Sequence, residues 1–569
     1  MQRNKKLRIL IALFSMFAAT SVMFTNCSEM GFAVLASNTG DPFYSYSWHL
    51  QNTGQKVFAS NAGTSGVDMN LQQTWAQGYT GKGVIIQVSD TGVEDIHEDL
   101  HGNFLYGGGS KDYTLSSPYL SNASAPRSSS DNHGTSVAGL IAAVADNGVG
   151  SRGVAPKASL TSANIISSVV THTNYSKILD QAQGSFDISN MSWGADQNYI
   201  DDDYGGYASA YEAQLKYGVT NQRNGKGAIY VKAAGNDYQV QCYGSSSSMC
   251  LGNSNFDRDD ANPYQIVVAA LDSSGSSASY SSPGANLWIS SYGGEHGSDS
   301  PAMFTTDRSG CGNGESISSA STSVLFEKGQ KGNTSCNYTA TFNGTSSAAP
   351  TLAGAVALML EAKPSLTWRD VKYILAKTAR SGTETGNYTH PYQISLPVGY
   401  NWEQKWITNG AGFKFHNWYG FGAVNVDAAV AMAKTYSSAL GTYHETTWFS
   451  SGTVNAAIPD YTAAGASNAI AVGSDNVKIE AVRIKLQVTH AAISQLAIEL
   501  TSPSGVKSIL VNAVNALTNQ ANYSGGEVLL SNAFYGENST GTWTIRVVDA
   551  QSGTTGTLVN WSINFVGGQ

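Results

Sequence analysis

Two kinds of hydrophobic pattern divide the chain. Between about residues 41 and 436, short apolar runs such as "GVIIQVSD" (83–90) and "GAIYVKAAGN" (227–236) alternate with stretches of helical period such as "TSSAAPTLAGAVALMLEA" (345–362). Alternation of this kind is typical of an α/β fold whose strands form a mainly parallel sheet. We therefore predict a large α/β domain over residues 41–436, with helices flanking the sheet.

The pattern changes after residue 436. From 437 to 569 the helical period almost disappears, and short alternating runs such as "AVRIKLQVTH" (481–490) and "TWTIRVVDA" (542–550) are separated by turn signals. Such runs predict an all-β sandwich or jelly roll. A chain of 569 residues is long enough for these two domains.

The first residues have the layout of an export signal. A basic start is followed by an apolar run from Ile9 to about Phe24, which is short for a membrane span of about 20 residues. We assign residues 1–27 to this signal and 28–40 to a short linker, and we expect a product delivered outside the cytoplasm. Two interpretations stay open. Either Cys27 resembles the lipid-accepting cysteine of bacterial lipoproteins, or cleavage follows Ala36 and the protein is secreted.

The net charge limits the class of partner, and the cysteines indicate the redox environment. The net charge is −9, and no basic cluster follows the extreme N-terminus, which argues against nucleic acid as the main partner. Four later cysteines fall into two spaced pairs, Cys242 with Cys250 and Cys311 with Cys336. In an exported chain they predict two disulfides, although four cysteines allow three pairings. We expect a monomer.

Four polar residues stand at strand or helix boundaries, where a reactive site can assemble. Asp90 ends a strand-like run, so its carboxylate is expected at the carboxyl edge of the sheet. His133 begins an apolar helix, Asn236 follows another strand-like run, and Ser346 stands where a loop turns into a helix. A serine with a base in reach, and a group that orients the base, is an activated nucleophile. Helix N-terminal N–H groups and the Asn236 amide would stabilise an oxyanion.

The motifs around these residues resemble those of the subtilisin-like serine proteases. "SDTG" (89–92), "HGTSVAG" (133–139) and "GTSSAAP" (344–350) follow the order Asp, His, Ser that the family uses. The tail, with "LAIELTSPSGVKSIL" (496–510) and "GTWTIRVVD" (541–549), is similar to the P domain of the kexin and furin branch, the proprotein convertases. The resemblance implies a subtilisin-like catalytic domain over 41–436 and a P domain over 437–569.

The resemblance also implies a role for each site residue. Asp90, His133 and Ser346 match the catalytic triad, and Asn236 matches the oxyanion-hole asparagine. A second set is expected to bind an extended peptide substrate, partly by pairing with its backbone. Its members are Ser192, Trp193, Gly194 and Asp257.

A calcium site is implied as well. Its expected ligands are oxygen atoms from three separate segments, which suit Ca²⁺. They belong to Asp41, Asp99, Val144, Asn147, Val149 and Ser151. We expect this ion to stabilise the protein and not to take part in catalysis.

The chain departs from the branch at three places. Thr91 stands where a second aspartate follows the catalytic one, and Ser282 stands where a glutamate binds a second calcium ion. The segment after "SWG" is longer, which leaves open whether Asp196 or one of residues 201–203 faces the S1 pocket, which holds the P1 residue before the scissile bond. Asp257 is expected to keep one acidic group in this pocket. We therefore expect a preference for basic P1 residues, but not a strict dibasic rule.

The short stretch 28–40 has no room for the inhibitory propeptide domain usual in the family. We therefore expect either unaided folding or a separate folding partner. The leading hypothesis is a calcium-dependent, extracytoplasmic serine endopeptidase acting on proteins or peptides. The alternative is a catalytically idle subtilase scaffold whose P domain binds a partner. A serine esterase is disfavoured, because Ser346 lacks the Gly-x-Ser-x-Gly elbow.

Overall fold

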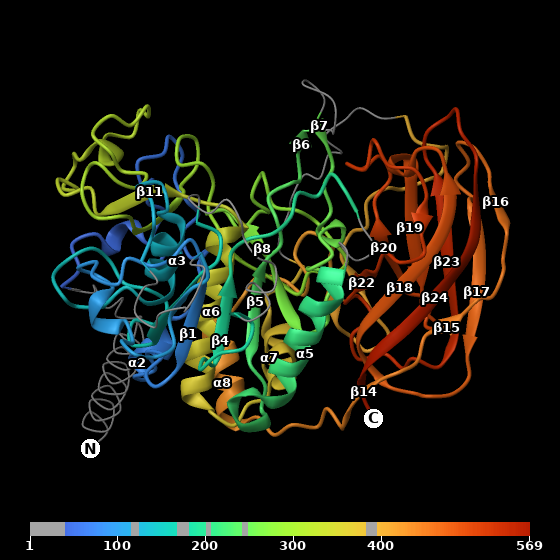
Figure 1. Ribbon diagram of the computed structural model, residues 1–569, viewed down its shortest axis with the longest axis horizontal. Coiled ribbons are helices and arrows are strands. Elements are labelled where there is room, and N and C mark those ends of the chain that lie inside the picture. Colours follow the sequence, from blue (N-terminus) through green and yellow to red (C-terminus); the bar gives the residue numbers. More distant parts are fainter. Residues whose placement is uncertain (1–39, 115–124, 168–180, 201–205, 242–248, 383–394) are drawn as a thin grey trace, which may run out of the picture. The chain divides into compact units, whose positions relative to one another are not determined.

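The computed structural model describes residues 40–114, 125–167, 181–200, 206–241, 249–382 and 395–569. The chain divides into two units, residues 1–40 and 41–569, and all elements below belong to the second. A parallel sheet of seven strands, ordered β2-β3-β1-β4-β5-β8-β9, is central to the α/β region (Figure 1). Its strands are β1 (Ile85–Asp90), β2 (Lys111–Asp112), β3 (Ser159–Asn164), β4 (Ile188–Met191), β5 (Ile229–Ala233), β8 (Gln265–Leu271) and β9 (Ile289–Tyr292).

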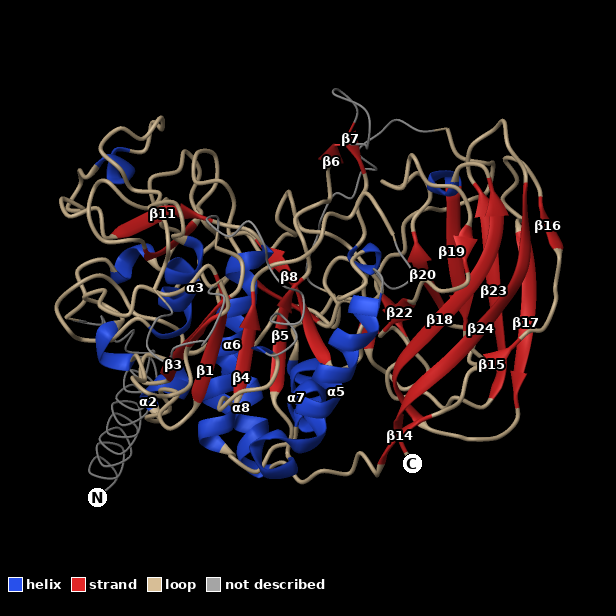
Figure 2. Ribbon diagram, in the orientation of Figure 1, coloured by secondary structure: helices blue, strands red, loops and turns tan. Residues whose placement is uncertain are grey.

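Helices flank this sheet (Figure 2). They are α2 (Gln72–Ala76), α3 (His133–Ala142), α5 (Tyr207–Gly225), α6 (Thr345–Ala362), α7 (Trp368–Thr378) and α8 (Val426–Thr435). Helix α6 contacts β4, β5, β8 and β9 and also packs against α3 and α8. It is buried along nearly its whole length, which explains why its sequence is apolar almost all round.

Short elements complete the α/β region. Three antiparallel ribbons are formed by β6 (Val240–Gln241) with β7 (Met249–Cys250), β10 (Met303–Thr306) with β11 (Tyr338–Phe342), and β12 (Ile407–Thr408) with β13 (Lys414–Phe415). The 3₁₀ turns here are η1 (Tyr44–Tyr46), η2 (His101–Asn103), η4 (Ser254–Phe256) and η5 (Leu325–Lys328). Because β11 leads directly into α6, the β10–β11 ribbon adjoins the segment that carries Ser346.

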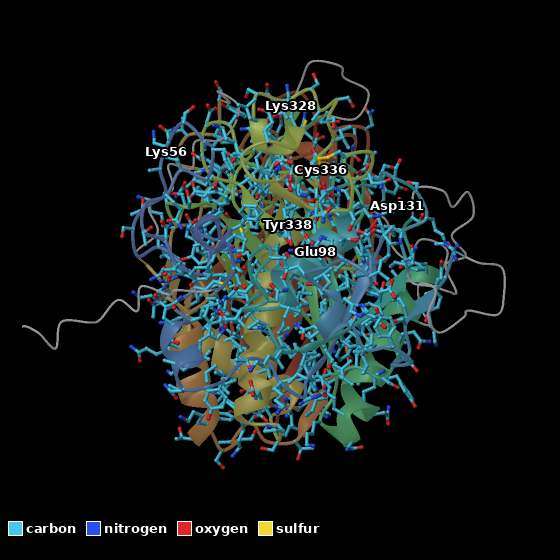
Figure 3. All side chains as sticks on the ribbon, turned by 90° about the vertical axis from the view of Figure 1, so that its left-hand side faces the viewer. Lys56, Glu98, Asp131, Lys328, Cys336 and Tyr338 are labelled. Atoms are coloured by element: carbon cyan, nitrogen blue, oxygen red, sulfur yellow. A yellow bond between two sulfur atoms is a disulfide. The ribbon has the colours of Figure 1, made fainter. Side chains whose placement is uncertain are left out.

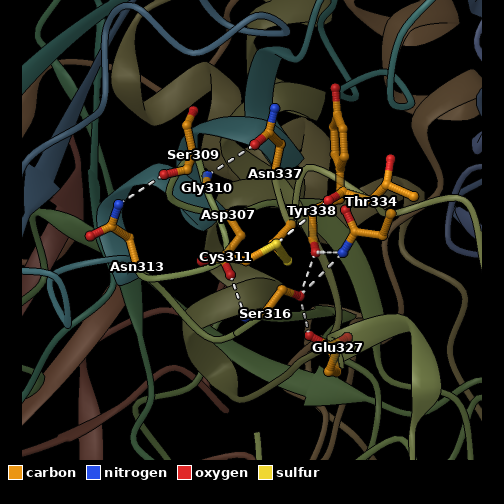
Figure 4. Close-up of a disulfide and its surroundings, with 12 residues drawn as sticks. Asp307, Ser309, Gly310, Cys311, Asn313, Ser316, Glu327, Thr334, Asn337 and Tyr338 are labelled. Atoms are coloured by element: carbon orange, nitrogen blue, oxygen red, sulfur yellow. Dashed lines mark hydrogen bonds between the residues drawn. A yellow bond between two sulfur atoms is a disulfide. The ribbon is translucent and has the colours of Figure 1, made fainter. Parts of the chain in front are cut away.

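The loop between β10 and β11 is closed by a disulfide. Cys311 and Cys336 are bonded across a sequence separation of 25, as Figure 4 shows. Near the disulfide, the buried Ser316 hydroxyl lies 2.5 Å from Glu327 Oε2 and 2.6 Å from the Tyr338 carbonyl oxygen. The loop is thus held by a covalent bond and by a buried polar cluster.

A further hydrogen bond holds the start of β11. The Tyr338 hydroxyl donates to Glu98 at 3.0 Å (Figure 3), which ties the start of β11 to the loop that precedes η2.

Cys250 is also disulfide-bonded, while Cys242 lies outside the described residues. The prediction of disulfides is therefore confirmed for the Cys311–Cys336 pair.

The region after α8 is built of strands. One sheet holds β14 (Tyr443–Glu445), β15 (Phe449–Ser450), β16 (Ala456–Ile458), β18 (Lys478–His490), β21 (Tyr523–Ser524), β22 (Leu529–Ser531) and β24 (Gly556–Gly568). The other holds β17 (Ala466–Val472), β19 (Leu496–Thr501), β20 (Lys507–Val511) and β23 (Gly541–Asp549), and η6 (Ile493–Gln495) precedes β19. These strands share an apolar core that includes the buried Trp543 and Trp561, so the predicted all-β region is confirmed. Its exact boundary at 436/437 stays a prediction.

Polar contacts join the strand-only region to the α/β region. Arg369 of α7 donates to Glu480 of β18 at 2.5 to 3.0 Å, and both side chains are about 10% exposed. Arg483 of β18 pairs with Glu212 of α5 at 2.6 Å. In the parts of the chain that the structure describes, no helix is both long and apolar enough to cross a membrane.

Candidate active site

Asp90 and His133 meet at the carboxyl edge of the parallel sheet. Asp90 is the last residue of β1 and His133 is the first of α3. The Asp90 carboxylate is fully buried, and its two oxygens lie 2.8 and 3.0 Å from His133 Nδ1. Because Nδ1 is committed to Asp90, proton exchange with a reacting group is left to Nε2.

The first turn of α3 packs closely against the turn that follows β1. Gly134 N donates to Thr91 Oγ1 at 3.0 Å, and a Cβ atom on Gly134 would lie only 2.3 Å from the Gly92 carbonyl oxygen. A side chain at position 134 would therefore push His133 away from Asp90. Thr91, which departs from the family pattern, serves here to anchor the start of α3.

The surroundings of His133 adjust its basicity. Burial disfavours the imidazolium ion, but the Asp90 charge and hydrogen bond favour it more, so the pKa of His133 is raised above its usual value. The ring also packs edge-on against Phe342, with centroids 5.3 Å apart. Since Phe342 ends β11 just before α6, this contact brings His133 to the segment that carries Ser346.

Ser346 lies in the first turn of α6. The preceding Gly344 has a φ of 99°, which favours glycine, and this residue turns the chain from β11 into the helix. Ser346 Oγ is half-buried and donates to the Ser192 carbonyl oxygen at 3.3 Å. The hydroxyl is thus placed against the segment after β4.

A second hydrogen bond joins Ser192 and Ser346, and Pro350 accounts for it. Proline has no N–H to give to the carbonyl four residues earlier, which here is that of Ser346. The Ser192 hydroxyl donates to this carbonyl instead, at 2.9 Å. The proline in α6 therefore leaves an acceptor through which Ser192 holds the segment after β4 beside Ser346.

Asn236 faces the same turn of α6 from the end of β5. Its Oδ1 accepts from Thr345 N at 2.8 Å and from Thr345 Oγ1 at 2.9 Å. A Cβ atom on Gly344 would come within 3.2 Å of Asn236 Nδ2. With Oδ1 held in this way, Nδ2 is the part of the amide that can donate to another group.

The expected substrate-binding residues lie together. Ser192, Trp193 and Gly194 follow β4 directly, and the buried Asp257 accepts from Ala195 N at 2.8 Å. Asp257 is only 2% exposed. Its carboxylate therefore lies behind the 192–195 segment.

Of the acidic residues left open by the sequence, Asp196 belongs to the described part of the chain. Burial first, and then the charges of Asp196 and Asp257, raise the pKa of Asp237 to about 6. Ser282 accepts from Asp237 N at 2.9 Å and is buried. Residues 201–203 lie outside the described residues.

The residues expected to bind calcium also converge. Asn147 donates from its backbone to Asp41 at 3.2 Å and from its side chain to Asp99 at 2.8 Å, while Ser151 N donates to Asp99 at 3.3 Å. Val144 N donates to the Asp99 carbonyl at 2.9 Å, and Val149 N donates to the Asn147 side chain at 3.0 Å. The six expected ligands therefore come from segments that meet in space.

The side chains of this cluster offer oxygen atoms, which are the ligands that a hard cation prefers. Asp41 and Asp99 are buried carboxylates, and burial, with the nearby Asp41 and Glu98 charges, raises the pKa of Asp99 to about 8. Oxygen-rich buried clusters of this kind fit Ca²⁺. Arg152 pairs with one oxygen of Asp41 at 2.6 Å and so offsets part of the charge. In the described ranges no group of three or more His, Cys, Asp or Glu suited to a metal ion is present, so a bound ion would depend on carbonyl and amide oxygens as well.

Sequence reasoning missed three residues that shape the site. Thr345 fixes the Asn236 amide, Pro350 leaves the acceptor for Ser192, and Lys232 of β5 lies buried beside Trp193. A proline within an apolar helix was a visible signal for the second. A lysine inside the apolar run of β5 was a visible signal for Lys232.

Comparison with known proteins decides the family. The subtilase family model matches residues 81–422. The chain belongs to the subtilase family. This subtilase also matches the proprotein convertase P-domain over residues 479–565. It is 33% identical to the Aeromonas extracellular serine protease of Aeromonas sobria over 551 residues, which cover 90% of this chain and 85% of that one. It is 28% identical to human proprotein convertase subtilisin/kexin type 6, over 93% of this chain and 48% of the relative.

Solved structures agree with this assignment. The crystal structure of the Aeromonas sobria serine protease superposes with a TM-score of 0.84 at 29% identity, over 93% of this subtilase and 96% of that chain. A crystal structure of the same protease in complex with a chaperone gives 0.83 at 28% identity, over 93% and 95%. The predicted subtilisin-like fold with a C-terminal P domain is confirmed, and this subtilase is a serine protease of that family.

Proposed function

We propose that this subtilase is an endopeptidase in which Ser346 is the nucleophile, His133 the general base and Asp90 the group that orients the base. The observation that carries the proposal is the buried Asp90 carboxylate bonded to His133 Nδ1 at 2.8 Å. This contact holds the imidazole in the tautomer that can accept a proton at Nε2. The idle-scaffold alternative gives no reason for such an arrangement.

The reaction follows from these positions. Ser346 Oγ attacks the peptide carbonyl carbon while His133 takes the hydroxyl proton, and the backbone N–H of Ser346 and Asn236 Nδ2 donate to the oxyanion. His133 then returns the proton to the leaving amine, and the acyl group stays on Ser346. Water, activated by His133, hydrolyses this ester. An extended substrate would pair with residues 192–194, which adjoin Ser346 through two hydrogen bonds.

The finer properties of the enzyme are part of the same proposal. The acidic residue Asp257 behind the 192–195 segment supports a preference for basic P1 residues in the manner of the kexin branch. The two buried carboxylates of Asp41 and Asp99, which Asn147 joins by donating to both, support a calcium ion bound by Asp41, Asp99, Asn147 and the carbonyls of residues 144, 149 and 151. Such an ion would neutralise buried charge and hold three segments together.

An extracytoplasmic location is supported by the Cys311–Cys336 disulfide, since disulfides persist in oxidising compartments. The signal-like start of the chain, and a relative described as extracellular, agree with it. Cys27 and Ala36 lie outside the described residues, so lipid anchoring and secretion both stay predictions.

A separate folding partner is proposed as well. The related Aeromonas sobria protease was crystallised with a chaperone, which supports an equivalent partner for this subtilase. Recovery of full activity after the purified chain alone is diluted from denaturant would contradict this part of the proposal.

The experiment that tests the catalytic proposal is mass-spectrometric profiling of a diverse peptide library digested by the purified chain in calcium, with Ser346→Ala as the control. Cleavage of internal peptide bonds by the wild type alone is expected. Equal digestion by both proteins would show that Ser346 is not the nucleophile. Lys or Arg enriched at P1 would support the basic preference.

A further inference from the structure

A lysine lies directly behind the segment that borders the nucleophile. Lys232 of β5 is fully buried, and its ammonium group donates to the Trp193 carbonyl oxygen. It also lies 4.9 Å from the centroid of the Trp193 ring. A Cβ atom on Gly194 would be 3.3 Å from Lys232 Nζ and 2.8 Å from Asp257 Oδ2. Both charged groups therefore contact the back of the 192–195 segment.

The ammonium group is enclosed by acidic residues from one loop. Lys232 Nζ lies 3.1 Å from Asp260 and 3.8 Å from Asp257. Asp259 N donates to Asp257 Oδ1 at 3.0 Å, which places Asp259 next to this pair. Arg258, in the same loop, pairs with Glu212 at 3.2 Å instead. Lys232 is thus the counter-ion that directly faces these aspartates.

The cluster keeps Lys232 charged. Burial disfavours the ammonium ion, but Asp260, Asp257 and Asp259 together raise the pKa of Lys232 above its usual value. Burial, and then the Asp257 charge, raises the pKa of Asp259 to about 8, and burial raises the pKa of Asp260 to about 7 although the Lys232 charge lowers it. Because the ammonium group lies within 3.1 to 3.8 Å of Asp260 and Asp257, it offsets negative charge that an incoming cation would otherwise meet.

We propose that Lys232 is a specificity-determining residue of the S1 pocket, whose ammonium group is a built-in counter-ion for Asp257 and Asp260 and weakens the selection for a basic P1 side chain. The inference rests on the proposed function, because it assumes that a substrate pairs with residues 192–194. A P1 ammonium or guanidinium that approached Asp257 would come close to a like charge that is already in place, and repulsion between such charges is strong away from water. Uncharged P1 side chains with long stems avoid this repulsion. The enzyme is therefore expected to cut after them as well.

The test compares two peptides that are identical except for lysine or norleucine at P1. The measured quantity is the ratio of kcat/KM for the lysine peptide to kcat/KM for the norleucine peptide, for the wild type and for Lys232→Met. Methionine is close to lysine in length but carries no charge. The ratio is expected to rise by at least about tenfold, because the like charge that is lost lies 3.8 Å from Asp257 Oδ2. An unchanged ratio in folded, active Lys232→Met would overturn the proposal.

Lys372→Met is the matched control. Lys372 is also buried, but its ammonium group donates to the carbonyl oxygens of Pro263 and Gln265 and not to the acidic cluster. Its loss is expected to leave the lysine-to-norleucine ratio within about twofold of the wild type. An equal rise in both variants would show a general effect of losing a buried lysine and would also overturn the proposal.

A second variant, Asp257→Asn, tests the proposal if Lys232→Met does not fold. In Asp257→Asn one carboxylate is lost while Lys232 stays, so the pocket becomes more positive and the ratio is expected to fall below the wild-type value. A ratio equal to the wild type would overturn the proposal. Labelling with a fluorophosphonate, measured on every variant, distinguishes a failure of the proposed function from a failure of the role proposed for Lys232. An unlabelled, inactive wild type contradicts the proposed function, whereas a labelled enzyme with unchanged ratios contradicts only the role of Lys232.

Discussion

The side-chain oxygen of Asn236 accepts two hydrogen bonds from Thr345, at 2.8 Å from the backbone N–H and 2.9 Å from the hydroxyl, although the residues are 109 positions apart. A backbone N–H can only donate, so the atom that faces it must be the amide oxygen. The orientation of Asn236 is therefore fixed by α6 itself, and its NH₂ group is left to donate to another group.

Asn236→Ala is expected to lower kcat by about 10²–10³-fold, because one preorganised donor to the oxyanion is lost. KM should change little, since the oxyanion forms only along the reaction path. Steady-state kinetics on a peptide substrate would check this. A kcat within twofold of the wild type would rule out Asn236 as an oxyanion donor.

The pH dependence of activity should depend on Asp90. His133 must be neutral to accept a proton, so kcat/KM is expected to fall as pH drops through its raised pKa. In Asp90→Asn the charge that favours the imidazolium is gone while burial remains, so the pKa of His133 falls and the acid limb moves to lower pH. The plateau of kcat should drop by about 10⁴-fold as the tautomer is lost.

The pH profiles of kcat/KM for the two proteins provide the check. An acid limb that stays at the wild-type pH in Asp90→Asn would mean that another group controls it. His133→Ala is the companion variant, because it should lose activity over the whole pH range.

Much of this architecture could be predicted from the sequence, and the reasons are local. The run that ends at Asp90 and the helix that starts at His133 each carry a periodic pattern, and the parallel sheet brings such boundaries to one edge. Ser346 and Asn236 follow the same rule. The predicted disulfide between Cys311 and Cys336 is confirmed, although spacing alone did not select the pairing.

Other features depend on contacts between distant segments, which no local pattern encodes. The bond from Ser192 to the Ser346 carbonyl arises only when β4 and α6 are packed together. The enclosure of Lys232 by Asp257 and Asp260 needs both β5 and the loop before β8. The sequence predicted Asp257 as a substrate-binding residue, and a lysine stood out in the run of β5, but the contact between the two is visible only in three dimensions.

The contact between Arg369 and Glu480 is expected to stabilise the joined α/β and strand-only regions. Both side chains are about 10% exposed, and Arg369 also donates to the Leu440 and Gly441 carbonyls at 2.8 and 2.7 Å. Arg369→Met leaves the Glu480 carboxylate buried without this partner, so the free energy of unfolding should fall by about 3–5 kcal/mol.

Lys216→Met is the matched control for that prediction. Lys216 pairs with Glu445 at 3.0 Å but is half-exposed, and such pairs contribute about 0–1 kcal/mol. Urea unfolding of the three proteins would compare them. Equal, small losses in both variants would show that the Arg369–Glu480 contact adds little to stability.

Calcium is expected to raise the melting temperature. A ligand that binds only the folded state stabilises it by about 2.7 kcal/mol at a concentration of one hundred times its Kd, so chelation with EGTA should lower Tm. Asp99→Asn weakens the proposed site and should make Tm insensitive to calcium. Scanning calorimetry with and without calcium is the measurement, and a wild-type Tm unaffected by EGTA would contradict a calcium site.

The most direct measurement is mass-spectrometric mapping of the residue that a fluorophosphonate modifies in the intact chain. The reagent should add to Ser346 alone, and the adduct should be lost in Ser346→Ala and strongly reduced in His133→Ala. An adduct on another serine, or none on folded wild-type protein under conditions that label other subtilases, would contradict a catalytic centre built from Asp90, His133 and Ser346.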